Sequence, residues 1–99
     1  MYTRSQGELL AAALRDNSTG YIVGTKTAGS VTGGNIVPLD DGSRLVVTTL
    51  IVRGGRGQEL NVVGLEPDAS VALDVQALAS GRDSQIEAAL DYLRTQSGE

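Results

Sequence analysis

Ser5 is the residue whose type and position first suggest chemistry. The run Ser5-Gln6-Gly7-Glu8 precedes a stretch of strong helix formers, so it predicts a helix that begins at a capping box. A serine at a helix N-terminus lies where backbone amides and the positive end of the helix dipole would stabilise an oxyanion. The spacing alone therefore leaves two roles open: an N-cap, which is the commoner role of such a serine, and a nucleophile.

The other polar candidates are less specific. Lys26 is the only lysine and lies in a polar loop, where a lysine is usually solvated, although a desolvated lysine can act as a general base. Glu8, Glu59 and Glu66 do not have the close spacing of metal ligands, so we expect no metal site and no cofactor. Residues 17–19 match the N-glycosylation pattern, but a polar turn is the better interpretation.

Composition excludes several classes of function. The 99 residues carry a net charge of −4 and no basic run, which argues against nucleic acid or an anionic membrane as the main partner. The chain has no Cys and no His, so it supplies no disulfide, no thiolate and no histidine base. We expect no membrane span, because no apolar run approaches the length of about 18 residues that a span needs.

Periodicity and turn signals predict the elements that position these residues. We expect a helix over residues 5–16, a short strand at 21–23, and a Thr/Gly-rich loop at 25–34. A hairpin of strands 36–39 and 44–53 follows, and its Asp-Gly suits a two-residue type I′ turn.

The remainder completes a mixed α/β layer in the order helix, strand, hairpin, strand, helix. A short strand is predicted at 60–63 and an edge strand at 71–73. A second capping box at 84–87 begins an amphipathic helix over about 83–96. Both faces of the 44–53 strand are apolar or nearly so and need cover, so we expect a partner segment, and self-association of the isolated chain.

The segments 5–16 and 22–29 resemble the C-terminal processing peptidases, or tail-specific proteases, of serine peptidase family S41. That family has Ser-x-Ser-Glu and an Ala-rich helix ending near Asp, followed by a short strand with Val-Gly-x-x-Thr-x-Gly. Leu-Asp-Asp-Gly-Ser at 39–43 and Gly-Leu-Glu-Pro-Asp at 64–68 match its later motifs in the same order. The resemblance covers about residues 2–93.

The resemblance implies a ClpP/crotonase-like α/β core, of which residues 1–99 would be the C-terminal segment, as a single domain or fragment. The upstream half of the core and the PDZ domain are absent from it. The implied function is a serine endopeptidase acting on polypeptide substrates, in an extracytoplasmic or periplasmic location. Ser5 would be the nucleophile and the backbone amide of Gln6 one oxyanion donor. The isolated chain is expected to be inactive without the upstream part of the same peptidase.

The general base is where the sequence departs from the family. In bacterial processing peptidases a lysine follows the nucleophile by 25 residues, and that position is Ser30 here. The glutamine usually found four residues later is Gly34. Lys26 lies four residues early and is the alternative base within the chain.

The tricorn-like and retinoid-binding-protein-like members of the family fit residues 24–30 better. In the tricorn-like enzymes the base is an upstream histidine, oriented by a serine and a glutamate. Glu59 is the candidate for that glutamate, although it lies two residues from the matching position, which Asn61 fills. The alternative function is a non-catalytic module of the same fold that binds a peptide or apolar ligand or packs against another chain. In that module Ser5 would be only a cap.

Overall fold

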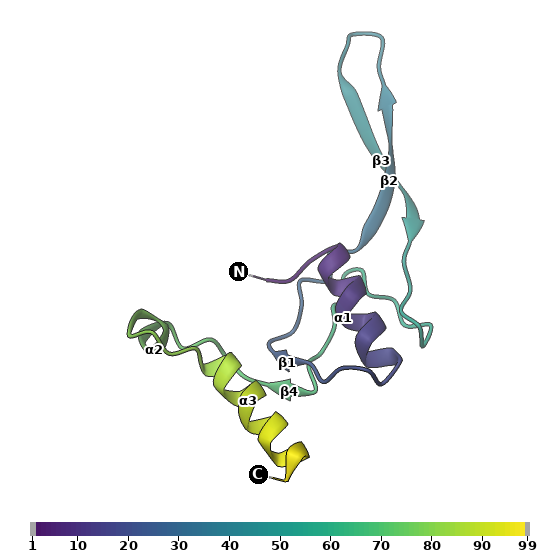
Figure 1. Cartoon of the computed structure of the whole chain (residues 1–99). Helices are drawn as coiled ribbons and strands as arrows, with labels where there is room; N and C mark the ends of the chain where they lie inside the picture. The colour runs from purple at the N-terminus through teal and green to yellow at the C-terminus, as the bar shows by residue number, and fades with distance from the viewer. Residues whose placement is uncertain (1, 99) are drawn as a thin grey trace. The chain divides into compact units, whose positions relative to one another are not determined.

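The computed structural model describes residues 2–98, which form two compact units. The first unit comprises the chain up to Gly20 together with Thr27–Leu65, and the second comprises Tyr21–Lys26 and the chain from Glu66 onward. Figure 1 labels the elements, which in chain order are α1 (Gln6–Asp16), β1 (Val23–Gly24), β2 (Thr32–Pro38), β3 (Arg44–Ile51), β4 (Ala69–Ser70), α2 (Val75–Ala79) and α3 (Ser84–Ser97).

Helix α1 begins and ends where the sequence predicts. Leu and Ala residues give it high helix propensity, and Asn17 closes its C-terminus, with Nδ2 donating to the Ala13 carbonyl at 2.8 Å. Glu8 and Ala12 are its buried residues. They are four positions apart, so they share one face of the helix.

A small apolar core lies beside that face. Its buried members are Ala12, Val31, Leu60 and Leu65, and Leu9, Ala11 and Val52 pack against it. The core therefore joins α1 to the segments that precede β2 and follow β3.

The predicted hairpin forms, but its turn differs. Strands β2 and β3 pair antiparallel from Thr32↔Ile51 to Pro38↔Arg44, with an irregularity between Gly33 and Gly34. A type I′ turn needs positive φ at both central residues, and of Asp41 and Gly42 only Gly42 has it, at 83°. The two-residue turn is therefore wrong: the Leu39 N–H donates to the Ser43 carbonyl at 2.9 Å and the Gly42 N–H to the Leu39 carbonyl at 3.0 Å, so residues 40–42 form the turn.

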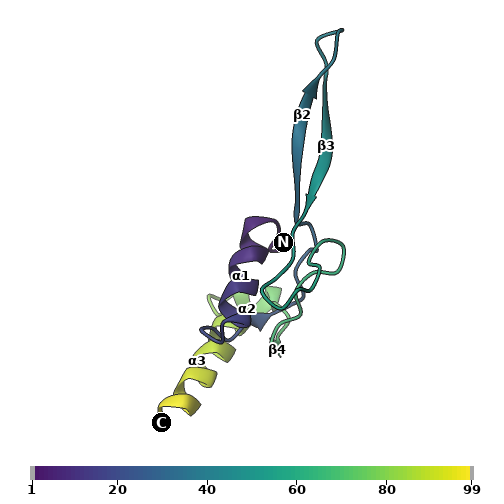
Figure 2. The same cartoon turned by 90° about the vertical axis from the view of Figure 1, so that its right-hand side faces the viewer.

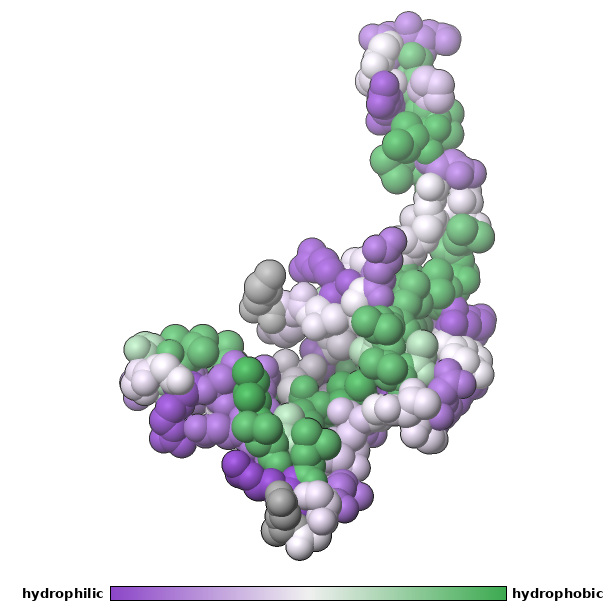
Figure 3. Space-filling view, in the orientation of Figure 1, coloured by the Kyte–Doolittle hydropathy of each residue, from purple (hydrophilic) through white to green (hydrophobic). Residues whose placement is uncertain are grey.

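The hairpin projects away from α1 in both views of the first unit (Figures 1 and 2). Every residue of β3 is exposed. Hydrophobic residues run along the hairpin below its polar tip in Figure 3. Those at least 39% exposed are Ile36, Val37, Leu39, Leu45, Val46, Val47, Leu50 and Ile51.

The strand predicted at 60–63 is wrong. Leu60 is fully buried, but the chain turns immediately after it, and the Gly64 N–H donates back to the Leu60 carbonyl at 2.8 Å. Val62 has a φ of 69°, a conformation that a β-branched residue rarely adopts. The single ladder contact nearby is an isolated bridge between Arg53 and Glu59.

In the second unit, β1 and β4 pair in parallel, Val23 with Ala69 and Gly24 with Ser70. Each strand has two residues, so the strands predicted at 21–23 and 71–73 are shorter than expected and displaced toward 23–24 and 69–70. Tyr21 and Tyr92 stack with their ring centroids 3.8 Å apart.

The C-terminal helices also belong to the second unit. Helix α2, which the sequence analysis does not predict, is capped by Asp74. Helix α3 confirms the predicted amphipathic helix, but its N-cap is Asp83, whose carboxylate accepts from Gln85 and Ile86. The capping box predicted at Ser84 is wrong, because the Ser84 hydroxyl donates to the Ala72 carbonyl at 2.9 Å. Within residues 2–98, no helix combines the length and the apolar character needed to cross a membrane.

Candidate active site

Ser5 lies on a turn immediately before α1. Its φ of 54° and ψ of −125° differ from the extended conformation that an N-cap usually has. A positive φ is uncommon for a residue other than glycine, and such strained positions concentrate at functional sites. Both halves of the capping box with Glu8 are present: the Ser5 side chain faces the Glu8 N–H without a well-formed capping hydrogen bond, and the Glu8 carboxylate accepts from the Ser5 N–H. Ser5 is exposed.

The backbone amides at the start of α1 are not equivalent. The N–H groups of Glu8 and Leu9 both donate to the Ser5 carbonyl, at 2.9 and 3.2 Å, and the Gly7 N–H donates to the Arg4 carbonyl at 3.2 Å. Among the residues that the structure describes, none accepts from the Gln6 N–H. The amide adjacent to Ser5 is thus the one that is open to an external acceptor.

Glu8 is a completely buried carboxylate in the first turn of α1, with an exposed fraction of 0%. Its Oε2 accepts from the Ser5 N–H at 3.1 Å and from the Ser30 N–H at 2.9 Å. Its Oε1 accepts from the Gly29 N–H at 2.8 Å and from the Thr27 hydroxyl. One side chain therefore ties the serine turn to the segment 27–30.

These contacts set the ionisation of Glu8. Burial acts to raise the pKa of the carboxyl, but the hydrogen bonds from Thr27, Ser30, Gly29 and Ser5 outweigh it, and the pKa is lowered. The carboxylate is consequently the form that this pocket of donors stabilises.

The segment 27–30 is held from its other side by the turn at 62–64. The Thr27 hydroxyl accepts from the Leu65 N–H at 2.7 Å, and the Val62 N–H donates to the Gly29 carbonyl at 2.6 Å. A Cβ on Gly29 would lie 2.8 Å from the Gly64 nitrogen, and a Cβ on Gly64 would lie 2.6 Å from the Thr27 carbonyl oxygen. Both glycines are required for this backbone-to-backbone approach.

Ser30 is brought directly against Ser5. The Ser5 N–H donates to the Ser30 carbonyl at 2.9 Å, so the Ser5 amide lies between that carbonyl and the Glu8 carboxylate. The structure thus places beside Ser5 the residue that the resemblance to bacterial processing peptidases predicts at the lysine position. The Ser30 residue is exposed, and its side chain carries no basic group.

The remaining predicted residues lie elsewhere. Lys26 belongs to the second unit, where its Nζ is 2.8 Å from Glu66 Oε1. Glu59 is exposed and takes part in the bridge with Arg53. Asn61, which the resemblance predicts at the position of the tricorn-like glutamate, accepts from the Val31 N–H at 3.3 Å. No group of three or more potential metal ligands occurs within residues 2–98.

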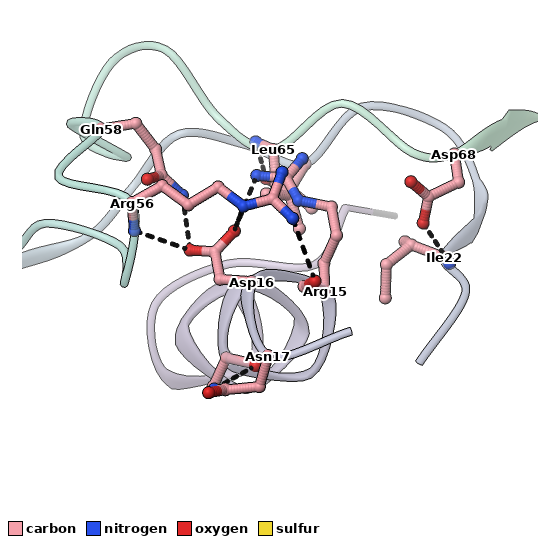
Figure 4. Close-up of polar contacts among 10 residues, drawn as sticks. Arg15, Asp16, Asn17, Ile22, Arg56, Gln58, Leu65 and Asp68 are labelled. Carbon is pink, nitrogen blue, oxygen red and sulfur yellow. Dashed lines mark hydrogen bonds and ion pairs between the residues drawn. The ribbon is translucent and has the colours of Figure 1, made fainter. Parts of the chain in front are cut away.

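A second polar cluster fixes the other end of α1. The Asp16 side chain is 2% exposed; it accepts from Gln58 Nε2 at 2.8 Å and from the Arg56 N–H at 3.4 Å, and Arg56 Nε lies 3.5 Å away (Figure 4). The hydrogen bond from Gln58 and the nearby Arg56 and Arg15 hold the pKa of the Asp16 carboxyl below its usual range. The helix that starts at the serine turn is therefore anchored at both ends within the first unit.

The sequence predicts Glu8 as part of a capping box but does not indicate that its carboxylate accepts from three residues of the segment 27–30. A local signal exists, because Glu8 lies four residues before Ala12, on the face of the helix that is buried. Its partners Thr27, Gly29 and Ser30 are 19 to 22 residues away, and no local pattern indicates them.

Comparison with known proteins gives consistent matches. The family model described as Peptidase family S41 matches residues 1–71. The chain is 38% identical over 76 residues to the chloroplastic C-terminal processing peptidase of Tetradesmus obliquus, which covers 77% of this chain and 16% of that protein. It is 34% identical over 94 residues to the carboxyl-terminal-processing protease of Picosynechococcus sp., covering 92% and 23%. The chain thus spans about a fifth of the length of these relatives.

Solved structures agree with the predicted α/β class. The photosystem II D1 C-terminal processing protease matches with a TM-score of 0.62 and 36% identity, over 70% of this chain and 18% of that chain. The tricorn protease matches with a TM-score of 0.73 over 96% of this chain and 10% of that chain. At 24% identity, this second match supports the fold alone.

Proposed function

This chain belongs to peptidase family S41, and on that premise we propose that it is the nucleophile-bearing C-terminal segment of a serine endopeptidase. The observation that carries the proposal is the Ser5 turn, in which an exposed hydroxyl without a capping bond lies next to the open amide of Gln6. A nucleophile adjacent to an oxyanion donor is the arrangement that acyl transfer requires.

In the proposed reaction, Ser5 Oγ attacks the carbonyl carbon of the scissile peptide bond. The carbonyl oxygen becomes an oxyanion and accepts a hydrogen bond from the Gln6 N–H. A general base takes the Ser5 proton and returns it to the leaving amine, which gives an acyl-enzyme that water hydrolyses. The partly positive N-terminus of α1 favours the negative charge of the oxyanion.

We assign the general base of this reaction to the upstream segment of the same peptidase. Ser30 occupies the position of the family's lysine, and Lys26 is the alternative within this chain. The Lys26 Nζ already lies in an ion pair with Glu66 Oε1, 2.8 Å away, an arrangement that does not favour a role as base. Glu59 would orient an upstream histidine only if its exposed side chain were recruited by that segment.

The domains, substrates and location that we propose for the whole protein are taken from its relatives. We propose that residues 1–99 act together with an upstream half-core and a PDZ domain on unstructured polypeptides with apolar C-termini. An extracytoplasmic location is consistent with the chloroplastic and cyanobacterial relatives. We also propose that the isolated chain is inactive, because the base and the second oxyanion donor lie outside it.

Fluorophosphonate labelling followed by peptide mapping tests the nucleophile. The probe is applied to the chain and to any longer protein that contains it, together with the Ser5→Ala variant. Ser18→Ala is the matched control, because Ser18 is also an exposed serine with a positive φ, at 55°. We expect the longer protein to carry a label on Ser5 that Ser5→Ala abolishes and Ser18→Ala retains, and the isolated chain to carry none.

A non-catalytic module is the second candidate, and the serine at position 30 and the glycine at position 34 favour it, because the family's lysine and glutamine are both replaced. Absence of label in both the chain and the longer protein would support this module. In that case Ser5→Ala would change only the stability of α1, by less than about 1 kcal/mol, because the hydroxyl makes no well-formed capping hydrogen bond.

A further inference from the structure

We infer that Glu8 is the positioning residue that holds Ser5 as a nucleophile instead of a helix cap, by binding the Ser5 turn and the Ser30 segment to one buried carboxylate. The inference deepens the proposed function and rests on it for the identity of Ser5 as the nucleophile. It assigns to Glu8 no contact with substrate.

The groups around Glu8 are all hydrogen-bond donors. Three are backbone N–H groups and the fourth is the hydroxyl of Thr27, which accepts from Leu65 and therefore directs its proton to Glu8. An amide or a protonated carboxyl at this position would place a donor against one of these donors. Only a carboxylate satisfies all four, so the arrangement depends on the charge as well as on the shape of the side chain.

The two carboxylate oxygens of Glu8 bind different segments. Oε1 binds Thr27 and Gly29 and so fixes the loop, whereas Oε2 binds Ser5 and Ser30 and so joins the serine turn to that loop. The Ser5 amide also donates to the Ser30 carbonyl. Its direction is thus determined by two acceptors that belong to different segments.

The two acceptors of the Ser5 N–H explain why Ser5 keeps a positive φ. A strained φ persists only where the surrounding structure fixes it, and here the Ser5 N–H is fixed between Glu8 and Ser30. Without the carboxylate, the extended N-cap conformation becomes accessible to Ser5, and its hydroxyl can then bond to a helix amide. Glu8 therefore selects between the two roles that a serine at this position can have.

The experiment compares Glu8→Gln and Glu8→Asp with Thr27→Val, Thr27→Ser and the wild type. Gln preserves shape and removes charge, while Asp preserves charge and shortens the reach. Val removes the Thr27 hydroxyl, and Ser restores it. Ala12→Gly is the stability-matched control, because Ala12 lies on the same buried face of α1 and supplies none of the hydrogen bonds of the carboxylate.

Two readouts are used. In the 99-residue chain, the intraresidue HN–Hα nuclear Overhauser effect of Ser5 reports positive φ, and the amide proton shifts of Gly29 and Ser30 report the carboxylate. The second readout uses the longer protein, if the fluorophosphonate labels its Ser5. The kinetics of this labelling give two quantities, the affinity for the probe and the maximal rate of inactivation. A positioning residue changes the rate and leaves the affinity nearly unaltered.

We expect Glu8→Gln to lose the strong Ser5 effect and the downfield amide shifts, and to slow inactivation by about 100-fold. Glu8→Asp and Thr27→Val should be intermediate, Thr27→Ser should resemble the wild type, and Ala12→Gly should lower the melting temperature without changing the Ser5 signal. If Glu8→Gln does not fold, Thr27→Val and Glu8→Asp decide the same question.

A folded Glu8→Gln that keeps the Ser5 signal and labels within about threefold of the wild type would overturn the inference. A loss of labelling in Ala12→Gly equal to that in Glu8→Gln would also overturn it, because stability alone would then explain the effect. Absence of label in the wild type would count against the proposed function, and the Ser5 signal would then decide the role of Glu8 independently.

Discussion

The surroundings of Glu8 and the β2–β3 hairpin belong to the same unit. The first region buries a charged side chain, whereas the second exposes apolar ones. Around Glu8 a charged group is fully buried and all of its partners come from within the chain. In the hairpin, apolar side chains on both faces are exposed, and every residue of β3 faces solvent.

The two regions differ in what their stability requires. The polar site requires particular atoms at particular distances, and this chain supplies them, so its local geometry is complete. The hairpin requires only apolar cover, which any surface of suitable shape can supply, and within residues 2–98 that cover is missing. Substitutions should therefore be costly near Glu8 and cheap in the hairpin.

The largest contrast in stability should come from two leucines. Leu60 is fully buried, whereas Leu45 on β3 is 51% exposed. We expect Leu60→Ala to lower the free energy of unfolding by about 3 kcal/mol, and Leu45→Ala to lower it by less than about 1 kcal/mol. Urea denaturation of both variants measures the difference. Equal losses would show that the hairpin is covered in solution.

The next largest effect concerns the charge of Glu8. At neutral pH, Glu8→Gln should lower the free energy of unfolding by about 2 kcal/mol, because charge-assisted bonds are lost and a donor faces other donors. The pKa of Glu8 is lowered in the folded chain, so its stabilisation is complete above the pKa of the unfolded chain and disappears as pH falls through the folded value.

The stability gap between wild type and Glu8→Gln should therefore close in acid. Denaturation curves of the two proteins at a series of pH values below 5 measure it, with the Asp40→Asn variant in the exposed hairpin loop as the control. A gap that persists unchanged below the folded pKa of Glu8 would contradict the assignment of a buried carboxylate.

A smaller effect of opposite sign is expected at Val62. This residue has a φ of 69° and is 85% exposed, so its side chain adds strain without packing in return. Asparagine tolerates this conformation better, and Val62→Asn should raise the free energy of unfolding by about 1 kcal/mol. Thermal denaturation measures it, and Val63→Asn is the neighbouring control. Destabilisation by Val62→Asn would mean that the side chain of Val62 has a partner.

The smallest change in stability, but a large change in association, is expected on β3. Val46 is 70% exposed, and Val46→Lys should alter the free energy of unfolding by less than about 0.5 kcal/mol. The same variant should reduce self-association of the chain, because it introduces a charge into the apolar hairpin. Sedimentation velocity over a range of concentrations measures it, with Leu10→Lys on α1 as the charge-matched control. A wild-type chain that stays monomeric at all concentrations would contradict the prediction that the exposed hairpin drives self-association.

The sequence predicts the elements whose causes are local. Helices α1 and α3 follow from periodicity and strong helix formers, and the hairpin follows from two apolar runs around Asp-Gly. The turn at 60–64 escapes prediction, because its β-branched residues favour a strand. The close approach of Gly29 and Gly64 overrides that propensity.

The candidate site divides in the same way. Ser5 is predicted from its place before a helix, and the resemblance to a peptidase family implies its role as nucleophile and the role of the Gln6 amide as oxyanion donor. The four-donor arrangement around Glu8 depends on residues brought together by the fold, so local spacing could not reveal it. The choice of Asp83 over Ser84 as N-cap is likewise settled by a distant acceptor, the carbonyl of Ala72.

The stacked pair of Tyr21 and Tyr92 gives the second unit an optical signature of its own. The chain has three tyrosines and no tryptophan, so its near-ultraviolet spectrum comes from tyrosine alone. Two of the rings lie face to face, whereas Tyr2 is 63% exposed. Near-ultraviolet circular dichroism therefore reports the second unit, and the amide signal reports both. Whether the two transitions coincide on heating shows, without any label, whether the two units melt together.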